Sequence, residues 1–401
     1  MPLGSEQVWN PNNIKAVLPI MEINWFLPTG GSDGRYLGTR IGGRVADFSY
    51  LQQVAHAVDT LGFNGALFPT GRHCEDAWIT GAALAAHTKR MKFIVAFRPG
   101  LIAPALASRT ASTFDRQTNG RLVVNIVTGG SDADTAADGL VLTHDERYEV
   151  TDEFLNIYRR ISDGEHVTFE GKHLKIYDGH NIFPNVQKPH PPIYFGGSSD
   201  AAHHVAAKHA DLYLTWGEPP PQVAEQIAKV RRYAEEEGRT VRFGIRLHII
   251  VRETQSEAWD AANDLIKYVD EDVIAAAQAA MSGSQATGQH RMQALHGGSK
   301  THLEVSPNLW AGVGLVRGGA GTALVGDADT IAQRMQEYVD LGVESFIFSG
   351  YPHLEEAYRT ADLLFPKLPT EYFDDHALKQ PTELLTEFSI PGRLANEFVR
   401  R

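Results

Sequence analysis

Short apolar runs alternate with longer amphipathic stretches along most of the chain. The apolar runs predict eight strands, at 23–27, 66–68, 93–97, 122–127, 193–195, 212–215, 243–251 and 345–348. Helical spacing predicts helices at 48–61, 77–87, 103–117, 152–161, 201–210, 222–237, 257–269 and 354–364. Nearly continuous apolar runs are typical of strands that are buried on both faces of a parallel sheet. Eight strand–helix units therefore predict an α/β fold, a TIM (β/α)8 barrel with insertions, rather than a doubly wound open sheet.

Two internal segments depart from this alternation. Residues 166–178 alternate in polarity around Gly171, which predicts a small hairpin. Residues 284–322 are rich in glycine, and only positions 289–295 have the pattern of a short helix. A connection of this length within a compact domain is usually functional. We therefore expect a long mobile lid loop that reaches the catalytic end of the barrel.

The pattern also predicts the organisation of the chain. Residues 1–21 are expected to be an N-terminal leader and residues 22–366 the barrel domain. Residues 367–401 are expected to form a tail, which is either an arm that packs on another subunit or a frayed end.

Composition excludes several classes of protein. The net charge is −12 and no basic block occurs, so nucleic acid is not expected as a partner. Cys74 is the only cysteine, which excludes an intrachain disulfide and a multi-cysteine metal site. No apolar run approaches the roughly 18 residues of a membrane span, and the first 20 residues show no signal-peptide pattern. We expect a cytoplasmic protein without a membrane partner.

Catalytic residues of TIM barrels lie at the carboxyl ends of the strands, so we searched the residues that follow each apolar run. Gly196, Gly197, Ser198 and Ser199 follow the fifth run and open a helix. Glycines allow a ligand to approach the backbone, and a helix N-terminus with two hydroxyls favours a phosphate. The alternative is an ordinary turn with a serine N-cap.

Two arginines could bind an anion. Arg246 and His248 are two residues apart in the seventh run and therefore share a strand face. A buried arginine at a barrel mouth requires a partner, either a nearby carboxylate or an oxyanion held by its guanidinium fork. Arg317, in the glycine-rich segment, could add a second charge or be a solvated loop residue.

Other candidates surround the same barrel end. His144 and Tyr148 are four apart on one helix face, where they could hold a phosphate or simply belong to a capped helix start. Trp216 and Tyr351 follow strands and could either form walls of a pocket or belong to the core.

Motifs of several other enzyme classes are absent from the sequence. There is no His-x-His after the first strand, no nucleophile elbow and no Walker loop. Cys74 is followed by Glu75 and Asp76, which disfavour the thiolate, so we interpret it as a lining residue rather than a nucleophile. No metal site is expected.

Taken together, the chain resembles the alkanesulfonate monooxygenases, flavin-dependent enzymes of the bacterial-luciferase-like superfamily. The matching stretches are Trp25-Phe-Leu-Pro-Thr29, Tyr36-Leu-Gly-Thr39, Pro69-Thr-Gly-Arg72, Cys74-Glu-Asp-Ala-Trp78, Tyr194-Phe-Gly-Gly-Ser-Ser199, Tyr213-Leu-Thr-Trp-Gly-Glu-Pro219, Phe243-Gly-Ile-Arg-Leu-His248, Asn308-Leu-Trp-Ala-Gly-Val-Gly-Leu-Val-Arg-Gly-Gly-Ala-Gly321 and Ser349-Gly-Tyr-Pro-His-Leu-Glu-Glu-Ala-Tyr358. They extend from about residue 22 to residue 366, so the resemblance covers all but the leader and the tail.

The resemblance implies a TIM barrel that uses reduced FMN (FMNH2) and O2. The FMNH2 would be supplied by a separate NAD(P)H-dependent FMN reductase. The reaction would cleave the carbon–sulfur bond of an organosulfonate and give sulfite and an aldehyde. Relatives are often homodimers or homotetramers. The glycine-rich segment would then act as a lid that excludes water.

The resemblance also implies roles for the candidate residues. Ser198, Ser199, Tyr148 and His144 would hold the FMN phosphate, beside Gly197, and Thr128 would lie near the flavin ring. Arg246, Arg317, His248 and Tyr351 would form a clamp for the sulfonate and carry the catalysis, with Trp216 as a wall.

Two departures from the family concern the substrate. Family members typically read Pro-Thr-His after the first strand, where this chain has Gly30, and typically have Ser before the cysteine, where this chain has His73. The first change makes room and the second adds a hydrogen-bonding group beside Cys74. Both suit a bulky hydroxylated sulfonate such as sulfoquinovose, with simple alkanesulfonates as the alternative. The competing function is a luciferase-like monooxygenase of a neutral substrate, such as a sulfone or an alkane.

Overall fold

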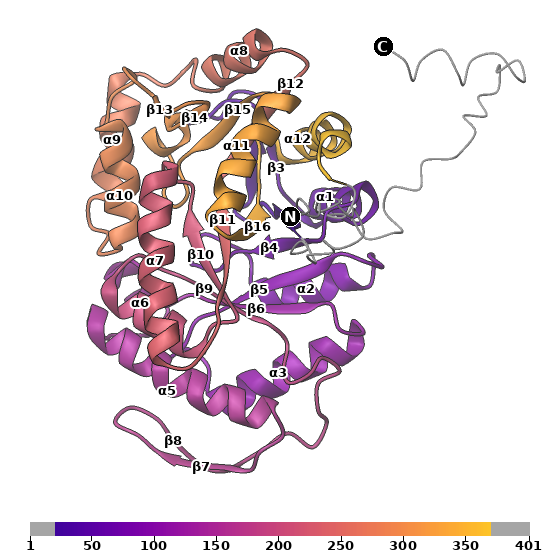
Figure 1. Ribbon diagram of the computed structural model, residues 1–401, viewed down its shortest axis with the longest axis vertical. Coiled ribbons are helices and arrows are strands. Elements are labelled where there is room, and N and C mark those ends of the chain that lie inside the picture. The colour runs from indigo at the N-terminus through magenta and orange to yellow at the C-terminus, as the bar shows by residue number, and fades with distance from the viewer. Residues whose placement is uncertain (1–20, 370–401) are drawn as a thin grey trace, which may run out of the picture.

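Eight parallel strands form a closed barrel in the computed structural model, which describes residues 21–369. The barrel strands are β1 (Glu22–Phe26), β4 (Gly65–Phe68), β5 (Lys92–Phe97), β6 (Leu122–Ile126), β9 (Ile193–Gly196), β10 (Leu212–Trp216), β11 (Arg242–Arg246) and β16 (Val343–Ile347). They are hydrogen-bonded in the order β1-β16-β11-β10-β9-β6-β5-β4 (Figure 1). The predicted α/β barrel is confirmed.

Helices cover the outside of the barrel (Figure 1). They are α1 (Phe48–Leu61), α2 (Ala77–Ala85), α3 (Pro104–Gln117), α4 (Asp132–Ala137), α5 (His144–Ser162), α6 (Asp200–His209), α7 (Pro220–Glu236), α11 (Ala328–Asp340) and α12 (His353–Arg359). Several begin where the sequence supplies a cap. Asp47 accepts a hydrogen bond from the backbone N–H of Tyr50 at the start of α1.

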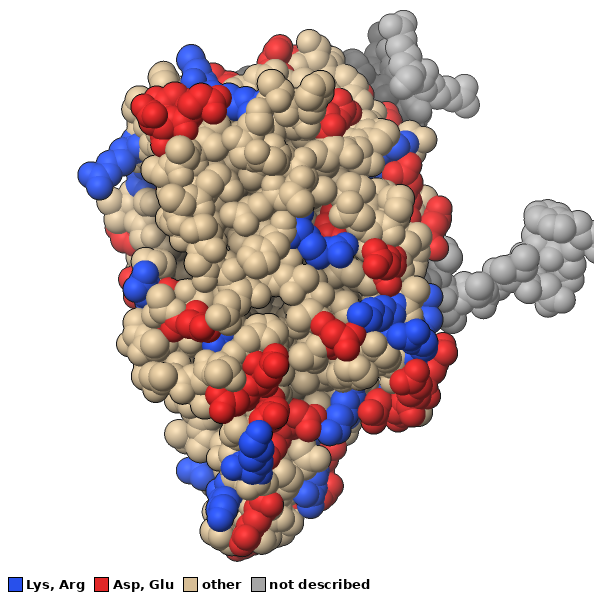
Figure 2. Space-filling view, turned by 90° about the vertical axis from the view of Figure 1, so that its left-hand side faces the viewer, with Lys and Arg blue, Asp and Glu red and all other residues tan. Residues whose placement is uncertain are grey.

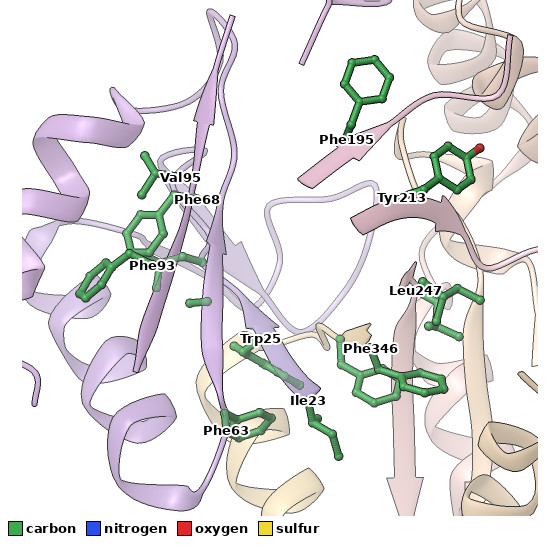
Figure 3. Packing of buried hydrophobic residues seen from close by; sticks show 14 of the residues in the cluster. Ile23, Trp25, Phe63, Phe68, Phe93, Val95, Phe195, Tyr213, Leu247 and Phe346 are labelled. Atoms are coloured by element: carbon green, nitrogen blue, oxygen red, sulfur yellow. The ribbon is translucent and has the colours of Figure 1, made fainter. Parts of the chain in front are cut away.

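Neighbouring residues of each strand pack on opposite sides of the barrel wall, as the period of two requires. Ile193 and Phe195 belong to the large core between strands and helices, whereas Tyr194 belongs to a smaller cluster inside the barrel. The large core is rich in aromatic rings, and Trp25 lies 5.3 Å from Phe63 between their ring centroids (Figure 3). Residues that point into the barrel near the carboxyl ends of the strands can therefore form the floor of a pocket.

The seventh predicted strand, 243–251, is two strands. β11 ends at Arg246, and β12 (His248–Arg252) leaves the barrel and pairs in parallel with β15 (Ala323–Asp327). Two short strands, β14 (Leu309–Trp310) and β13 (Glu304–Ser306), complete this second sheet. The prediction of one strand is wrong because both halves are apolar and buried, so the hydrophobic pattern carries no sign of the break.

The segment 284–322 is not a loop without regular structure. It contains α10 (Thr287–His296), β13, β14 and a 3-10 helix at Gly312–Leu315, and it follows α8 (Gln255–Leu265) and α9 (Glu271–Met281). Trp310 and its neighbours are buried in a second hydrophobic core. The strands were missed because each has only two or three residues, too few for periodicity to show. The mobility of this segment stays a prediction.

Two hairpins extend from the barrel. β2 (Ser32–Gly34) pairs with β3 (Gly43–Val45), and β7 (Val167–Glu170) pairs with β8 (Lys175–Gly179). The second one confirms the hairpin predicted at 166–178. Of the predicted leader (1–21) and tail (367–401), all but Met21 and residues 367–369 lie outside the described residues.

The surface carries charges of both signs. Lys and Arg are interspersed with Asp and Glu on the face shown in Figure 2, and no extended basic surface is seen on that face. In the part of the chain that the structure describes, no helix is long and apolar enough to cross a membrane.

Candidate active site

A cavity of about 710 Å³ opens at the carboxyl ends of β6, β9 and β10. This volume lies within the range of small-molecule and cofactor sites. Nine of the residues predicted for cofactor or substrate line it: His73, Thr128, His144, Tyr148, Gly197, Ser198, Ser199, Trp216 and Arg246. The structure thus brings together residues that are up to 173 positions apart in the chain, from His73 to Arg246.

The turn from β9 into α6 forms a cradle for an anion. Gly197 has a φ of 154°, and a side chain there would place its Cβ 2.7 Å from the Cβ of Ala202. Ser199 caps the helix, since its Oγ accepts a hydrogen bond of 3.2 Å from the backbone N of Ala202. The Tyr213 hydroxyl donates to the Gly197 carbonyl at 2.7 Å and fixes the turn from below. A phosphate can therefore approach the backbone at the positive end of α6.

His144 and Tyr148 lie on the cavity side of α5, with ring centroids 5.0 Å apart. The Tyr148 hydroxyl lies 3.4 Å from the position that a Gly197 Cβ would take, so it faces the same turn. The predicted start of this helix, residue 152, is too late. Thr143 and Glu146 form a capping box that starts α5 at His144, and the pair T-x-x-E was the signal available in the sequence.

Sequence reasoning missed the floor of the cavity and the part of its roof that α9 forms. Leu67, Asn125 and Leu214 line its floor from inside the barrel. Asn125 is a polar residue in the otherwise apolar strand β6, and this break in the pattern could have identified it. The end of α9 and the start of α10 form part of the lining, and Gly288 approaches Trp216 so closely that a Cβ would lie 3.1 Å from its ring.

Arg246 points into the barrel mouth and is 5% exposed. Its Nη2 donates to Ser349 Oγ at 2.8 Å and its Nη1 donates to the Leu247 carbonyl at 2.6 Å. His248 converges on the same hydroxyl, with Nδ1 2.6 Å from Ser349 Oγ. Arg246 and His248 were predicted to share one strand face, but they belong to two strands, β11 and β12, and meet instead at the Ser349 hydroxyl.

Arg317 also contacts the ring of Phe26. The guanidinium carbons of Arg246 and Arg317 are 4.8 Å and 5.5 Å from the centroid of Phe26. Tyr351 stacks on His248, with ring centroids 5.3 Å apart. The four residues of the predicted clamp therefore form one cluster. Phe26 belongs to this cluster too, and it was not among the predicted site residues.

The two arginines of this cluster have no carboxylate partner in the described part of the chain. Among residues 21–369, neither Arg246 nor Arg317 forms an ion pair with an acidic side chain. Burial, together with the charge of Arg317, lowers the pKa of Arg246 to about 9, so the guanidinium remains charged at neutral pH. Burial lowers the pKa of His248 well below its usual range, and this imidazole is neutral. A buried charge that lacks an internal counterion is suited to receive an anion from outside.

His353 is a further residue of the cluster that the sequence analysis missed. Its Nδ1 lies 2.9 Å from the Asp33 carboxylate, which also accepts a hydrogen bond of 2.5 Å from Tyr50. Its Nε2 is buried and has no hydrogen-bond partner among the described residues. Burial lowers the pKa of His353 although Asp33 raises it, so Nε2 presents a lone pair. The ring of Tyr351 lies 5.0 Å away.

The two residues predicted to set substrate size and polarity, Gly30 and His73, lie next to each other, and Cys74 follows His73 in the chain. Gly30 and His73 are exposed, and a Cβ on Gly30 would lie 3.5 Å from the His73 carbonyl. His73 lines the cavity, with Nε2 3.1 Å from Arg72 Nε. Cys74 is half-buried, and burial raises the pKa of its thiol, which supports the interpretation of a lining residue over a nucleophile.

Comparison with known families gives one clear match. The model of the family described as luciferase-like monooxygenase matches residues 21–345. Three similar solved structures are a riboflavin lyase with modified FMN and the substrate riboflavin, a long-chain alkane monooxygenase, and DmoA from Hyphomicrobium sulfonivorans.

All three structures share the fold over most of both chains. The TM-scores are 0.71, 0.69 and 0.73, at 18%, 20% and 19% sequence identity. The matches cover 87%, 87% and 90% of this chain and 91%, 91% and 90% of the others. At such identities the similarity concerns the fold alone.

Proposed function

The chain belongs to the luciferase-like monooxygenase family, and from this premise we propose that it cleaves the carbon–sulfur bond of an organosulfonate, using reduced FMN and O2 and giving sulfite and an aldehyde. The reduced FMN would come from a separate NAD(P)H-dependent FMN reductase. The active form would be a homodimer or a homotetramer.

The observation that carries this proposal is the unpaired positive charge at the barrel mouth. Arg246 and Arg317 flank Phe26 without an acidic partner in the described part of the chain. A sulfonate is a permanent anion with three oxygens, and guanidinium groups bind such oxyanions in a fork geometry. A neutral substrate would leave the buried charge of Arg246 uncompensated, at an energetic cost.

The cavity beside this cluster fits FMN. The Gly197 turn, which a side chain would fill, together with Ser198, Ser199 and Tyr148 would hold the phosphate, and Thr128 would lie near the flavin ring. When bound in its reduced form, FMN supplies the activation of O2. The chain itself would orient the sulfonate through Arg246 and exclude water through the roof formed by α9 and α10.

We further propose that the substrate carries hydroxyl groups, as sulfoquinovose does. The absence of a side chain at Gly30 leaves room at the rim, and the exposed imidazole of His73 offers a hydrogen bond there. Simple alkanesulfonates need neither feature.

Sulfite release tests the proposal. The protein is mixed with FMN, NADH, O2 and an independent flavin reductase, and methanesulfonate, octanesulfonate and sulfoquinovose are offered separately. Sulfite from sulfoquinovose alone is the expected result. Sulfite from the alkyl substrates alone would keep the C–S cleavage and reject the argument from Gly30 and His73.

Matched variants connect the activity to the charge cluster. Arg246→Met should raise KM or lower kcat/KM by about 10- to 100-fold, since one charged hydrogen bond contributes about 1.5–3 kcal/mol. Arg90→Met is the control, because Arg90 is exposed and precedes β5 at the opposite end of the barrel. If reduced FMN binds but no sulfonate yields sulfite, the proposal fails and a neutral substrate such as a sulfone or an alkane becomes the better candidate.

A further inference from the structure

The ends of the β7–β8 hairpin carry a group of side chains that the proposed reaction does not use. His166 directly precedes β7, and Asp178 and His180 lie at the end of β8 and just after it. The hairpin projects from the lower end of the molecule in Figure 1, where α5 separates it from α6. Among the described residues, this is the one group of three metal-ligating side chains whose ligand atoms all lie within 4.8 Å of one another.

The hairpin register holds the two histidines next to each other. Val167 pairs with Gly179, so His166 and His180 occupy the next position on each strand. Their rings are nearly parallel, with an interplanar angle of 15° and centroids 4.1 Å apart. The Asp178 carboxylate lies beside both, with Oδ1 2.8 Å from His166 Nδ1 and 3.7 Å from His180 Nδ1.

We propose that His166, Asp178 and His180 bind a divalent transition-metal ion of the Zn²⁺ type. Imidazole nitrogen with a carboxylate oxygen is the donor set that such ions prefer. Ligand atoms bonded to one ion at 2.0–2.1 Å are about 3.4 Å apart in tetrahedral geometry. The separations of 2.8 Å and 3.7 Å from Asp178 Oδ1 to the two histidine Nδ1 atoms lie on either side of this value, and rotation of the stacked imidazole rings would let both face one ion.

The environment of the three side chains allows an ion to enter. The side chains of His166 and Asp178 are 67% and 72% exposed, and the side chain of His180 is 33% exposed. No lysine or arginine forms an ion pair with Asp178 in the described chain, so an ion meets no fixed competing cation there. The fourth position is open to water. A bound ion would tie the two ends of the hairpin together.

Isothermal titration of the full-length, tag-free protein with ZnCl2 tests the proposal. We expect one equivalent to bind and the Tm to rise, because the ion binds the folded chain preferentially. His166→Ala and His180→Ala should each weaken binding by about tenfold or more and abolish the rise in Tm. All three positions are on the surface, so circular dichroism should show that the variants fold.

His204→Ala is the matched control. His204 is also exposed and lies 3.6 Å from a carboxylate, that of Asp200, but it has no second histidine within ligand distance. The control should bind Zn²⁺ as the parent does. The proposal is overturned if the parent binds no Zn²⁺, or if the binding is the same in His166→Ala and His180→Ala as in the parent.

Discussion

Replacing Arg246 by lysine should turn a positive charge that persists at neutral pH into one that titrates near neutral pH. The site lowers the pKa of the Arg246 guanidinium to about 9, chiefly through burial and also through the charge of Arg317. The same environment acting on a lysine, whose ordinary pKa is about 10.4, gives a pKa of about 7. The parent cation is present below pH 9 and is lost above it, whereas the variant cation is lost above pH 7.

No other group of the cluster obscures this difference between pH 6.5 and 8.5. Burial lowers the pKa of His248 and of His353, so both are neutral. Burial raises the pKa of Tyr351 and of Cys74, so both remain protonated. In the variant, a pH dependence of anion binding in this range therefore reports the lysine at position 246.

The assay measures the KM for the active sulfonate at saturating reduced FMN. For the parent, KM should change by less than about twofold between pH 6.5 and 8.5, since most Arg246 remains charged. For Arg246→Lys, KM should rise by about tenfold, or 1.4 kcal/mol, for each pH unit above the lysine pKa.

Arg317→Lys is the control, because position 317 is only half-buried and a lysine there keeps its charge in water. Its KM should be flat over the same range. An Arg246→Lys profile as flat as that of the parent would refute the reasoning, because it would mean that the site does not penalise a buried cation.

Three further substitutions test the cavity and its roof. Gly197→Ala should weaken FMN binding by at least about tenfold, measured by fluorescence quenching, since its Cβ would meet Ala202 at 2.7 Å and the φ of 154° is strained for any side chain. Tyr148→Phe should weaken FMN binding by about fivefold and leave kcat unchanged at saturating FMN, because it removes one hydrogen bond. An unchanged Kd for FMN would exclude the hydroxyl as a phosphate ligand. Arg291→Met should lower the free energy of unfolding, measured in urea, by about 3–5 kcal/mol. The reason is that the buried Glu218 carboxylate loses the guanidinium that now lies 2.5 Å away. Adding Glu218→Gln to this variant should restore the stability.

The barrel was predictable because it repeats a local pattern. Each apolar run is followed by an amphipathic stretch, and both are set by residues close in sequence. The second sheet was not predictable in this way, because β13 and β14 have three and two residues and pair with distant segments. α9 was also missed, since its run of alanines shows no distinct polar face.

In the candidate site too, contacts between residues close in sequence could be predicted and contacts between distant residues could not. Arg246 and His248 were predicted to be neighbours from their spacing, and the structure places both on Ser349. His353 could not be found from spacing. Its carboxylate partner, Asp33, lies 320 positions away, and only the folded chain shows that one ring nitrogen is left without a partner.

Because the chain leaves the barrel after Arg246, one side of the proposed active site belongs to a single insertion between β12 and β15. The chain leaves the barrel at β12 and returns along β15, and these strands pair residue by residue from His248↔Ala323 to Arg252↔Asp327. The excursion between them carries Arg317 and α10, while the barrel supplies the Gly197 turn. Exchange of this single excursion between homologues would therefore replace one wall of the proposed substrate pocket and leave the proposed phosphate site at the Gly197 turn in place. The paired strands mark the two splice points for such a chimera.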